Sequence, residues 1–248
     1  MTTYPYDLTG PIGSSAILGL IALSTDETVE QDFWHMFPQR DVAVYISRVA
    51  AGAELNPDTI ATMAGHITGA ASLFPMSLDF DTISYACTSG TTLIGEDRVA
   101  DLVREGAKTR NVTNPLTASV AALRALGATR LGVVSPYIAT VADAIRDAFV
   151  ARGFEVPKTL SFGEELEARV ARIDPKSIQA AALEIGRDPE VDAVFLSCTN
   201  LRTMDIIDAL EDELGKPVVS SNQALAWHMA QLAGCTAGPY APRKLFRL

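Results

Sequence analysis

Two short segments of this sequence resemble each other although they lie far apart in the chain. Segments 85–89 (YACTS) and 196–200 (LSCTN) each hold a cysteine at the centre, and each follows an apolar run that begins at an aspartate. The two cysteines, Cys87 and Cys198, are 111 residues apart. A chain with such a repeat is constrained to fold as two similar units.

Two further matches extend the repeat. Segment 130–134 (RLGVV) repeats segment 17–21 (ILGLI) at an offset of 113, and Asn222 stands 108 residues after Asn114. These offsets are far longer than the period of solenoid repeats. The predicted division is an N-terminal half at 14–115, a C-terminal half at 116–225, and a last helix at about 222–234 that packs back on the first half.

Apolar runs of strand length alternate with helical patterns along both halves. The runs are apolar throughout, which is typical of parallel strands covered on both faces. The order predicts an α/β fold of two pseudo-symmetric parallel-sheet halves. Strands are predicted at 16–23, 42–46, 82–86, 109–113, 130–134, 156–160, 192–195 and 217–220. Helices are predicted at 27–37, from Asn56-Pro57 to about 73, after 114–115, at 140–151, after 174–175, at 200–214 and after 221–222.

Both cysteines follow a predicted strand. Parallel sheets bind ligands beyond the carboxyl ends of their strands. A pseudo-twofold axis would therefore place Cys87 and Cys198 on opposite walls of one cleft, the predicted active site. Each cysteine also precedes a predicted helix, whose first N–H groups favour a thiolate.

The composition limits the partners of this protein. A net charge of −10 argues against nucleic-acid binding, and the longest apolar runs are too short to span a membrane. Segment 1–5 lacks the features of a signal peptide, so we expect a cytoplasmic protein. We predict no metal and no cofactor, because no cysteine or histidine pair has ligand spacing and segment 10–13 is no nucleotide-binding motif. The predicted partner is a small carboxylate.

A single cysteine is more often a small buried hydrophobe than a nucleophile, and Cys235 is interpreted in that way. Two facing thiols can instead carry a proton to and from opposite faces of a carbon beside a carboxylate, after only a modest lowering of their usual pKa of about 8.5. One thiolate could also add to an activated double bond, allow rotation and leave. The groups expected to bind the substrate beside Cys87 and Cys198 are backbone N–H groups and the side chains of Thr88, Ser89, Thr199 and Asn200.

These motifs resemble the cofactor-independent aspartate/glutamate racemase superfamily. Segments 86–89 (ACTS), 197–203 (SCTNLRT), 18–21 (LGLI) and 134–137 (VSPY) are most similar to its maleate cis–trans isomerase and arylmalonate decarboxylase branch. The resemblance implies that Cys87 is the thiolate that acts on the substrate and Cys198 its acid/base partner. It implies that Tyr137 binds a substrate carboxylate, and that the protein is a homodimer or a higher homo-oligomer.

Two positions depart from the maleate isomerase pattern. Asp26 stands where those enzymes carry an asparagine that binds a carboxylate, and Glu164, Glu165 or Glu167 stands near a second such asparagine. An anion would repel a carboxylate, so an amine or amide suits these positions better. The changes resemble the ectoine-utilisation subgroup, whose members handle an acylated diamino acid. The alternative interpretations are a helix cap for Asp26 and a solvated helix face for the glutamates.

The sequence thus predicts a cofactor-independent isomerase or racemase of a small amino, acylamino or dicarboxylic acid. One alternative is an arylmalonate-type decarboxylase that uses Cys198 as its proton donor. Decarboxylases of that type carry glycine at the position of Cys87, so the presence of both thiols favours the isomerase or racemase. The other alternative is a non-catalytic ligand-binding protein, which would need no paired thiols.

Overall fold

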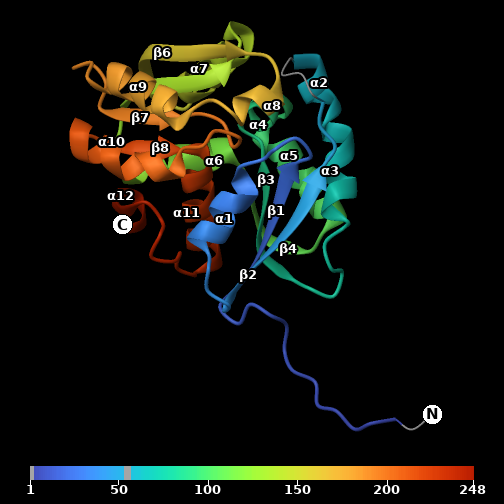
Figure 1. Ribbon diagram of the computed structural model, residues 1–248. Helices are drawn as coiled ribbons and strands as arrows, with labels where there is room; N and C mark the ends of the chain where they lie inside the picture. The colour runs from blue at the N-terminus through green and yellow to red at the C-terminus, as the bar shows by residue number, and fades with distance from the viewer. Residues whose placement is uncertain (1–2, 53–56) are drawn as a thin grey trace.

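A computed structural model describes residues 3–52 and 57–248, and its strands form two parallel sheets of four strands each (Figure 1). The first sheet has the order β2-β1-β3-β4 and the second the order β6-β5-β7-β8. The strands are β1 Ala16–Leu23, β2 Val42–Val49, β3 Phe80–Ala86, β4 Thr109–Thr113, β5 Arg130–Tyr137, β6 Glu155–Glu164, β7 Ala193–Leu196 and β8 Val218–Ser220. The predicted α/β fold of two equivalent parallel-sheet halves is confirmed.

The repeat is visible in the register of the central strands. Gly19 of β1 pairs with Ile83 of β3, and Gly132 of β5 pairs with Val194 of β7, which gives the predicted offsets of 113 and 111. Both glycines lie where a helix or loop packs tightly on the sheet. A Cβ at Gly19 would lie 3.2 Å from the side chain of Phe74 in the loop after α3, and one at Gly132 would lie 2.9 Å from Ile185 of α9.

The third predicted match is wrong by two residues. Asn114 caps the helix after β4, and Ser220 caps the helix after β8. The structural counterpart of Asn114 is therefore Ser220, and Asn222 lies inside the helix. A side-chain oxygen at the N-cap satisfies a free backbone N–H group, and serine and asparagine serve equally well there.

Helices cover both sheets. Those of the first half are α1 Val29–Met36, α2 Pro57–Thr62, α3 Ala64–Ala71, α4 Thr88–Ile94, α5 Glu96–Gly106 and α6 Pro115–Ala125. Those of the second half are α7 Ala139–Val150, α8 Glu167–Val170, α9 Pro175–Gly186, the 3-10 turn η1 Met204–Ile206, α10 Ile207–Leu214, α11 Ser221–Ala233 and α12 Arg243–Phe246.

Two helix predictions need correction. The helix predicted from Asn56-Pro57 to about 73 is two helices, α2 and α3, that meet at Met63, and Asn56 lies outside the described residues. The helix predicted at 200–214 begins only at η1, because residues 199–203 form turns whose polar groups bond to distant segments. Tertiary hydrogen bonds override helical periodicity there.

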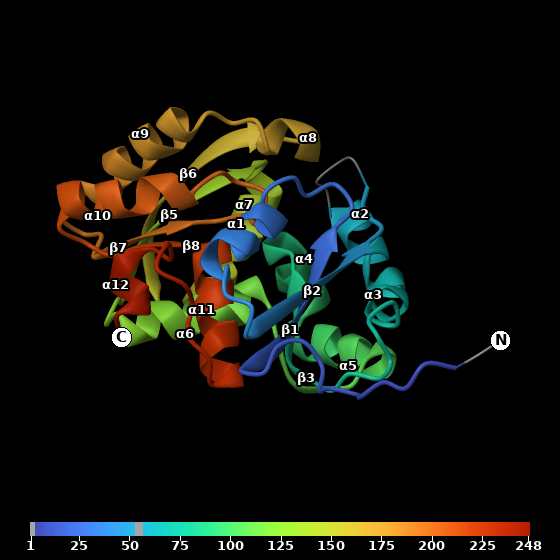
Figure 2. The same ribbon diagram turned by 60° about the horizontal axis from the view of Figure 1, so that its bottom comes forward.

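Helix α11 joins the two halves. It follows β8 in the second sheet but packs against β1, β3 and β4 of the first sheet and against α1 and α6. Both ribbon views show it at the junction of the halves (Figures 1 and 2). The division at residue 115 stays a prediction.

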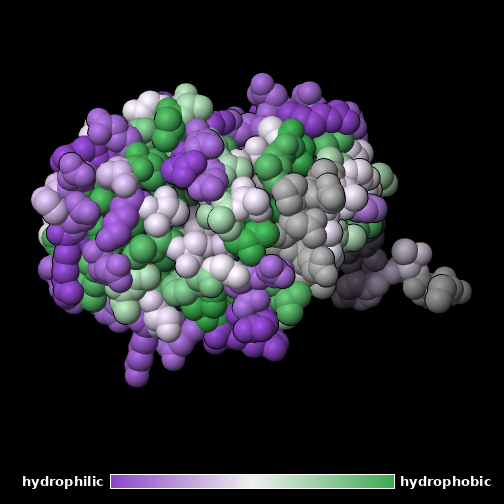
Figure 3. Space-filling model, turned by 90° about the horizontal axis from the view of Figure 1, so that it is seen from above, coloured by the Kyte–Doolittle hydropathy of each residue, from purple (hydrophilic) through white to green (hydrophobic). Residues whose placement is uncertain are grey.

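Residues 3–12 form an exposed arm, as the proline- and glycine-rich composition predicts. The arm projects from the body of the protein in the view from above (Figure 3). Over the described parts of the chain, no helix is both long and apolar enough to cross a membrane.

Candidate active site

Cys87 lies at the carboxyl end of β3 and caps helix α4, as predicted. Its Sγ atom accepts a hydrogen bond from the Gly90 N–H at 3.2 Å and lies 3.7 Å from Ser89 Oγ. A Cβ at position 90 would lie 2.6 Å from the Tyr85 hydroxyl and 2.8 Å from Cys87 Sγ. Glycine at position 90 therefore lets the backbone approach the thiol.

Cys198 lies at the carboxyl end of β7 in a different local geometry. Its φ of 134° is the only positive value among the non-glycine residues of the described chain. Such a backbone costs about 1–3 kcal/mol and persists only where its surroundings enforce it. No helix begins here, so the predicted helix terminus exists at Cys87 but not at Cys198. The Asn200 N–H instead donates to Cys198 Sγ at 3.3 Å.

Ser221 connects the loops that carry the two thiols. Its Oγ accepts a hydrogen bond from the Cys198 N–H at 3.0 Å and lies 2.9 Å from Thr88 Oγ1. A second connection runs from the Thr199 hydroxyl to the Ala86 carbonyl oxygen at 3.3 Å. The predicted residues Thr88 and Thr199 thus hold the two halves together at the thiols. Sequence reasoning missed Ser221, which it treated only as a helix cap.

Tyr137 ends β5 and is fully buried beside the thiols. Burial raises the pKa of Tyr137 well above its usual value, and the nearby Cys198, Glu167 and Cys87 raise this pKa further. The phenol therefore stays protonated. Its hydrogen bond to Cys198 is one of the contacts that favour the Cys198 thiolate.

Glu167 is the first residue of α8 and is 3% exposed. The predicted solvated face is therefore wrong for Glu167, whereas Glu165 is exposed and Glu164 pairs with Arg169 at 2.9 Å. Burial raises the pKa of Glu167 to about 7. A hydrogen bond from Asn200 has the opposite, smaller effect on this pKa. Glu167 lines one cavity with Cys87 and accepts a hydrogen bond from Asn200, two residues after Cys198. Its charge raises the pKa of both thiols.

Asp26 is buried in the turn between β1 and α1. Its Oδ1 accepts hydrogen bonds from the N–H groups of Thr28 and Val29, both at 2.8 Å. Asp26 therefore satisfies N–H groups at the start of α1, as a cap does, but the N-cap residue itself is Thr28, two residues later than predicted. Its Oδ2 is buried and has no hydrogen-bond partner among the described residues. Burial raises the pKa of Asp26 above its usual value. A nearby Thr199 hydroxyl opposes this rise but does not cancel it.

Asn200 bonds to several segments with one side chain. Its Oδ1 accepts a hydrogen bond from the Glu27 N–H at 2.8 Å, and its Nδ2 donates to Glu167 Oε2 at 2.9 Å. Weaker bonds run from Nδ2 to the carbonyl oxygens of Glu167 and Thr25, at 3.3 and 3.4 Å. In this geometry the Nδ2 group of Asn200 is fully used within the protein, whereas Oδ1 accepts one hydrogen bond and can accept a second.

Burial of the two thiols favours their protonated forms. Burial raises the pKa of Cys87 to about 11, and the Glu167 charge adds to the rise. Burial raises the pKa of Cys198 well above its usual value, again with a contribution from Glu167. This corrects the predicted modest lowering: the N–H groups beside the thiols do not outweigh their desolvation.

The space beside Cys87 is small. A cavity of about 10 Å³ lies there, large enough for roughly one water molecule. It is lined by Leu23, Ala51, Gly52, Thr59, Ile60, Met63, Cys87, Ser89 and Glu167. Both thiols are buried in this structure. No group of three or more metal-ligating side chains occurs in the described chain.

Two α/β halves that each bring one thiol to a shared buried site define the aspartate/glutamate racemase-like class. A family model described as arylmalonate decarboxylase matches residues 18–246. The chain belongs to this family, which confirms the predicted branch.

Curated relatives carry two activities. An arylmalonate decarboxylase of Bordetella bronchiseptica is 37% identical over 126 residues, which cover 49% of this chain and only 51% of that protein. A maleate isomerase of Alcaligenes faecalis is 24% identical over 231 residues, covering 87% and 88% of the two chains.

Solved structures share the fold. A maleate isomerase from Pseudomonas putida has a TM-score of 0.83 at 22% identity, covering 93% of this chain and 98% of that chain. A Nocardia farcinica maleate cis–trans isomerase, a cysteine-to-serine variant with a covalently bound succinylcysteine intermediate, has a TM-score of 0.81 at 24% identity, covering 94% and 99%. These similarities show the fold alone.

Proposed function

We propose that this protein is a cofactor-independent isomerase or racemase of a small carboxylic acid that carries an amino or acylamino group. Cys87 and Cys198 would be its two proton-transfer groups. The observation that carries the substrate class is the buried carboxyl group of Glu167, placed beside both thiols.

Glu167 has no cationic partner in the described part of the chain. Its neighbours Arg169 and Arg172 pair with Glu164 and Glu27. A second buried carboxyl group, that of Asp26, is close enough to raise the pKa of Glu167. The site therefore favours a ligand that brings a positive charge or N–H donors.

The charges argue against a dicarboxylate. Two unit charges 4 Å apart interact by about 4 kcal/mol at an effective dielectric constant of 20. A substrate carboxylate at this distance from Glu167 would meet repulsion of this order above pH 7, where Glu167 is mostly ionised. An ammonium group at the same place would be attracted and would also lower the pKa of both thiols, which assists formation of a thiolate.

The proposed racemisation balances without a cofactor. The thiolate of one cysteine takes the α-hydrogen as a proton, and the electron pair remains on the substrate as a carbanion next to the carboxyl group. The thiol of the other cysteine gives its proton to the opposite face. The two cysteines end with exchanged protonation states, and Tyr137 and the N–H groups near the thiols would stabilise the carboxylate.

Decarboxylation is the second candidate, because the family model and one curated relative carry that activity. In this mechanism the substrate loses carbon dioxide and Cys198 alone protonates the carbanion. Cys87 would then be dispensable, which separates the two candidates.

An NMR substrate panel in heavy water tests the proposal. Amino acids, Nα-acylated and Nγ-acylated diamino acids, maleate and an arylmalonate are each incubated with the enzyme. We expect deuterium at the α-carbon and loss of optical purity for an amino or acylamino acid. Conversion of maleate alone would overturn the substrate class. Carbon dioxide release that survives in a Cys87→Ala variant would replace the proposal by decarboxylation.

A further inference from the structure

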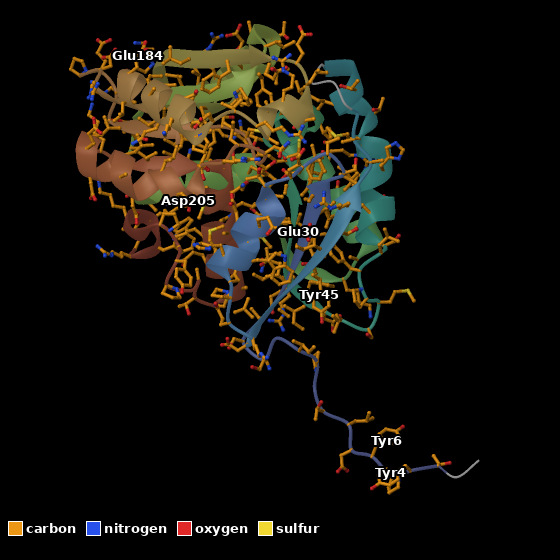
Figure 4. All side chains as sticks on the ribbon, viewed as in Figure 1. Tyr4, Tyr6, Glu30, Tyr45, Glu184 and Asp205 are labelled. Carbon is orange, nitrogen blue, oxygen red and sulfur yellow. The ribbon has the colours of Figure 1, made fainter. Side chains whose placement is uncertain are left out.

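The N-terminal arm exposes a row of apolar side chains. Tyr4, Tyr6 and Leu8 are 86%, 77% and 87% exposed, and Ile12 follows them. The first hydrogen bond described along the chain is that of Ser15, to Asp41 at 2.7 Å. Figure 4 shows Tyr4 and Tyr6 far from the body of the protein.

The arm has the pattern of a strand that lacks a partner. Apolar residues at positions 4, 6 and 8 alternate, so in an extended chain their side chains lie on one face. Pro5 keeps the preceding backbone extended. Contiguous exposed apolar surface of this kind marks an interaction site.

A groove of about 750 Å³ lies at one end of the first sheet. Its accessible apolar surface comes from Met76, which is 88% exposed, and from the half-buried Leu78, whereas Phe74 and Phe80 lie beneath them in the core. Its basic side includes Arg104 and Lys108, for which no ion pair is described in the structure. The lining also holds Asp79, Glu105 and Arg110; Glu105 pairs with Arg98, and Arg110 pairs with Asp81. The groove therefore offers apolar surface beside two cations, Arg104 and Lys108, that exceed the one remaining acidic residue, Asp79.

The arm and the groove share the amino edge of this sheet. The arm leads into the first residue of β1, and the groove is lined by the first residues of β3 and β4, Phe80 and Thr109. The thiols lie at the opposite, carboxyl edge. In a single copy the arm runs away from the body in both ribbon views (Figures 1 and 2).

We infer that residues 3–12 of one copy bind in the groove of a second copy, and that the exchange is reciprocal. In a twofold dimer whose two copies face each other through the amino edges of their first sheets, the arm of each copy reaches the groove of the other. Such a reciprocal contact is an isologous interface. Ten extended residues span up to roughly 35 Å, enough to cross such an interface. Tyr4, Tyr6 and Leu8 would pack on Met76 and Leu78, and the carboxylate of Asp7 would pair with Arg104 and Lys108.

Cross-linking of full-length variants tests the arrangement. A Leu8→Cys variant is mixed with a Met76→Cys variant under mild oxidation. In the control, a Val150→Cys variant replaces the Leu8→Cys variant, because Val150 is exposed on α7, away from the arm. We expect a disulfide-linked dimer of one Leu8→Cys chain and one Met76→Cys chain. Its yield should be at least tenfold higher than that of the corresponding dimer in the control. Equal cross-linking in the control would overturn the inference.

Two further measurements complete the test. Combining Tyr4→Ser, Tyr6→Ser and Leu8→Ser should raise the dimer dissociation constant at least tenfold by sedimentation, and Val150→Ser should leave it unchanged. A chain with both Leu8→Cys and Met76→Cys should cross-link between copies. A disulfide formed only within one chain, or a dimer unaffected by the arm substitutions, would overturn the inference.

Discussion

The side-chain amide of Asn200 donates a hydrogen bond of 2.9 Å to Glu167 Oε2, while its oxygen accepts one of 2.8 Å from the Glu27 N–H. One amide thus ties the Cys198 loop to α8 of its own half and to the loop before α1 of the other half. The bond fixes a carboxyl group beside both thiols, where its charge opposes their ionisation.

Replacement of Glu167 by glutamine keeps the shape of the side chain and removes its charge. We expect KM for an amino or acylamino substrate to rise at least tenfold, about 1.4 kcal/mol, because the charge that attracts the substrate is lost. The pKa of both thiols should fall, because the Glu167 charge raises them. Steady-state kinetics and the pH dependence of thiol alkylation measure the two effects.

Glu165→Gln is the matched control, since Glu165 is an exposed neighbour of Glu167. It should change neither quantity. An unchanged KM and an unchanged alkylation profile in Glu167→Gln would mean that this carboxyl group has only a structural role.

Cys87→Ser and Cys198→Ser should each reduce racemisation by a factor of 100 or more, because each removes one of two proton-transfer groups. Each variant retains one thiol, which can still remove and return the α-hydrogen on its own face of the substrate. Exchange of this hydrogen with solvent can therefore persist for one of the two enantiomers. Polarimetry measures racemisation, and NMR in heavy water measures exchange. The unfolding midpoint in urea should change little, since serine is close to cysteine in size.

Cys235→Ser serves as the control, because Cys235 is only half-buried and lies outside the site. Its activity should match that of the unmodified protein. Full racemase activity in either Cys87→Ser or Cys198→Ser would exclude the two-thiol mechanism.

Local patterns account for what the sequence predicted well. The strands before Cys87 and Cys198 are continuous apolar runs, and the register of Gly19 and Gly132 repeats the predicted offset. Strand positions, halves and the location of both thiols follow from such runs. The hydrogen bonds of Asp26 can also be predicted from its neighbours, because they join N–H groups two and three residues later.

Long-range contacts account for what the sequence could not predict. Ser221 joins Thr88 and Cys198 across separations of 133 and 23 residues. Glu167 looks like a surface residue in its charged neighbourhood, but it is buried, bonds to Asn200 33 residues later and shares a cavity lining with Cys87 of the first half. The raised pKa of each thiol follows from burial, which no local motif encodes.

Ser221→Ala tests the link between the two thiol loops. The Cys198 N–H would lose its buried acceptor, at a cost of about 1–3 kcal/mol in the free energy of unfolding. Turnover should fall as the Cys198 loop relaxes, although Ser221 supplies no proton. Ser72→Ala is the control, because Ser72 bonds to the Gly69 carbonyl on the surface. Equal effects of the two substitutions on stability would contradict the role of Ser221.

Stability should depend on pH through Glu167. Burial raises the pKa of Glu167 from 4.5 to about 7, so the folded state binds this proton more tightly than the unfolded state. The resulting stabilisation is fully present below pH 4.5 and is lost as the pH rises through about 7, a change of roughly 3 kcal/mol.

Urea unfolding at pH 5 and pH 8 measures this loss. Glu167→Gln should show a smaller decrease than the unmodified protein. Asp32, whose pKa burial raises to about 7, contributes in the same direction, so Asp32→Asn provides the parallel case. An identical decrease in all three proteins would show that neither carboxyl group governs the effect.

Gly90→Ala should damage the site through a single methyl group. The added Cβ would lie 2.6 Å from the Tyr85 hydroxyl and 2.8 Å from Cys87 Sγ, both buried. Overpacking of this kind costs about 1–3 kcal/mol. It should also lower turnover, because the Cys87 thiol must move from the Gly90 N–H that holds it.

Gly69→Ala provides the matched comparison within a helix. A Cβ there meets nothing within 4 Å, and alanine is the better helix former, so the protein should gain about 0.5–1 kcal/mol. Urea unfolding and turnover of the two variants separate the crowding at Cys87 from a general effect of losing glycine. A Gly90→Ala protein as stable and active as Gly69→Ala would mean that the Cys87 turn adjusts freely, which is incompatible with a thiol held in place for catalysis.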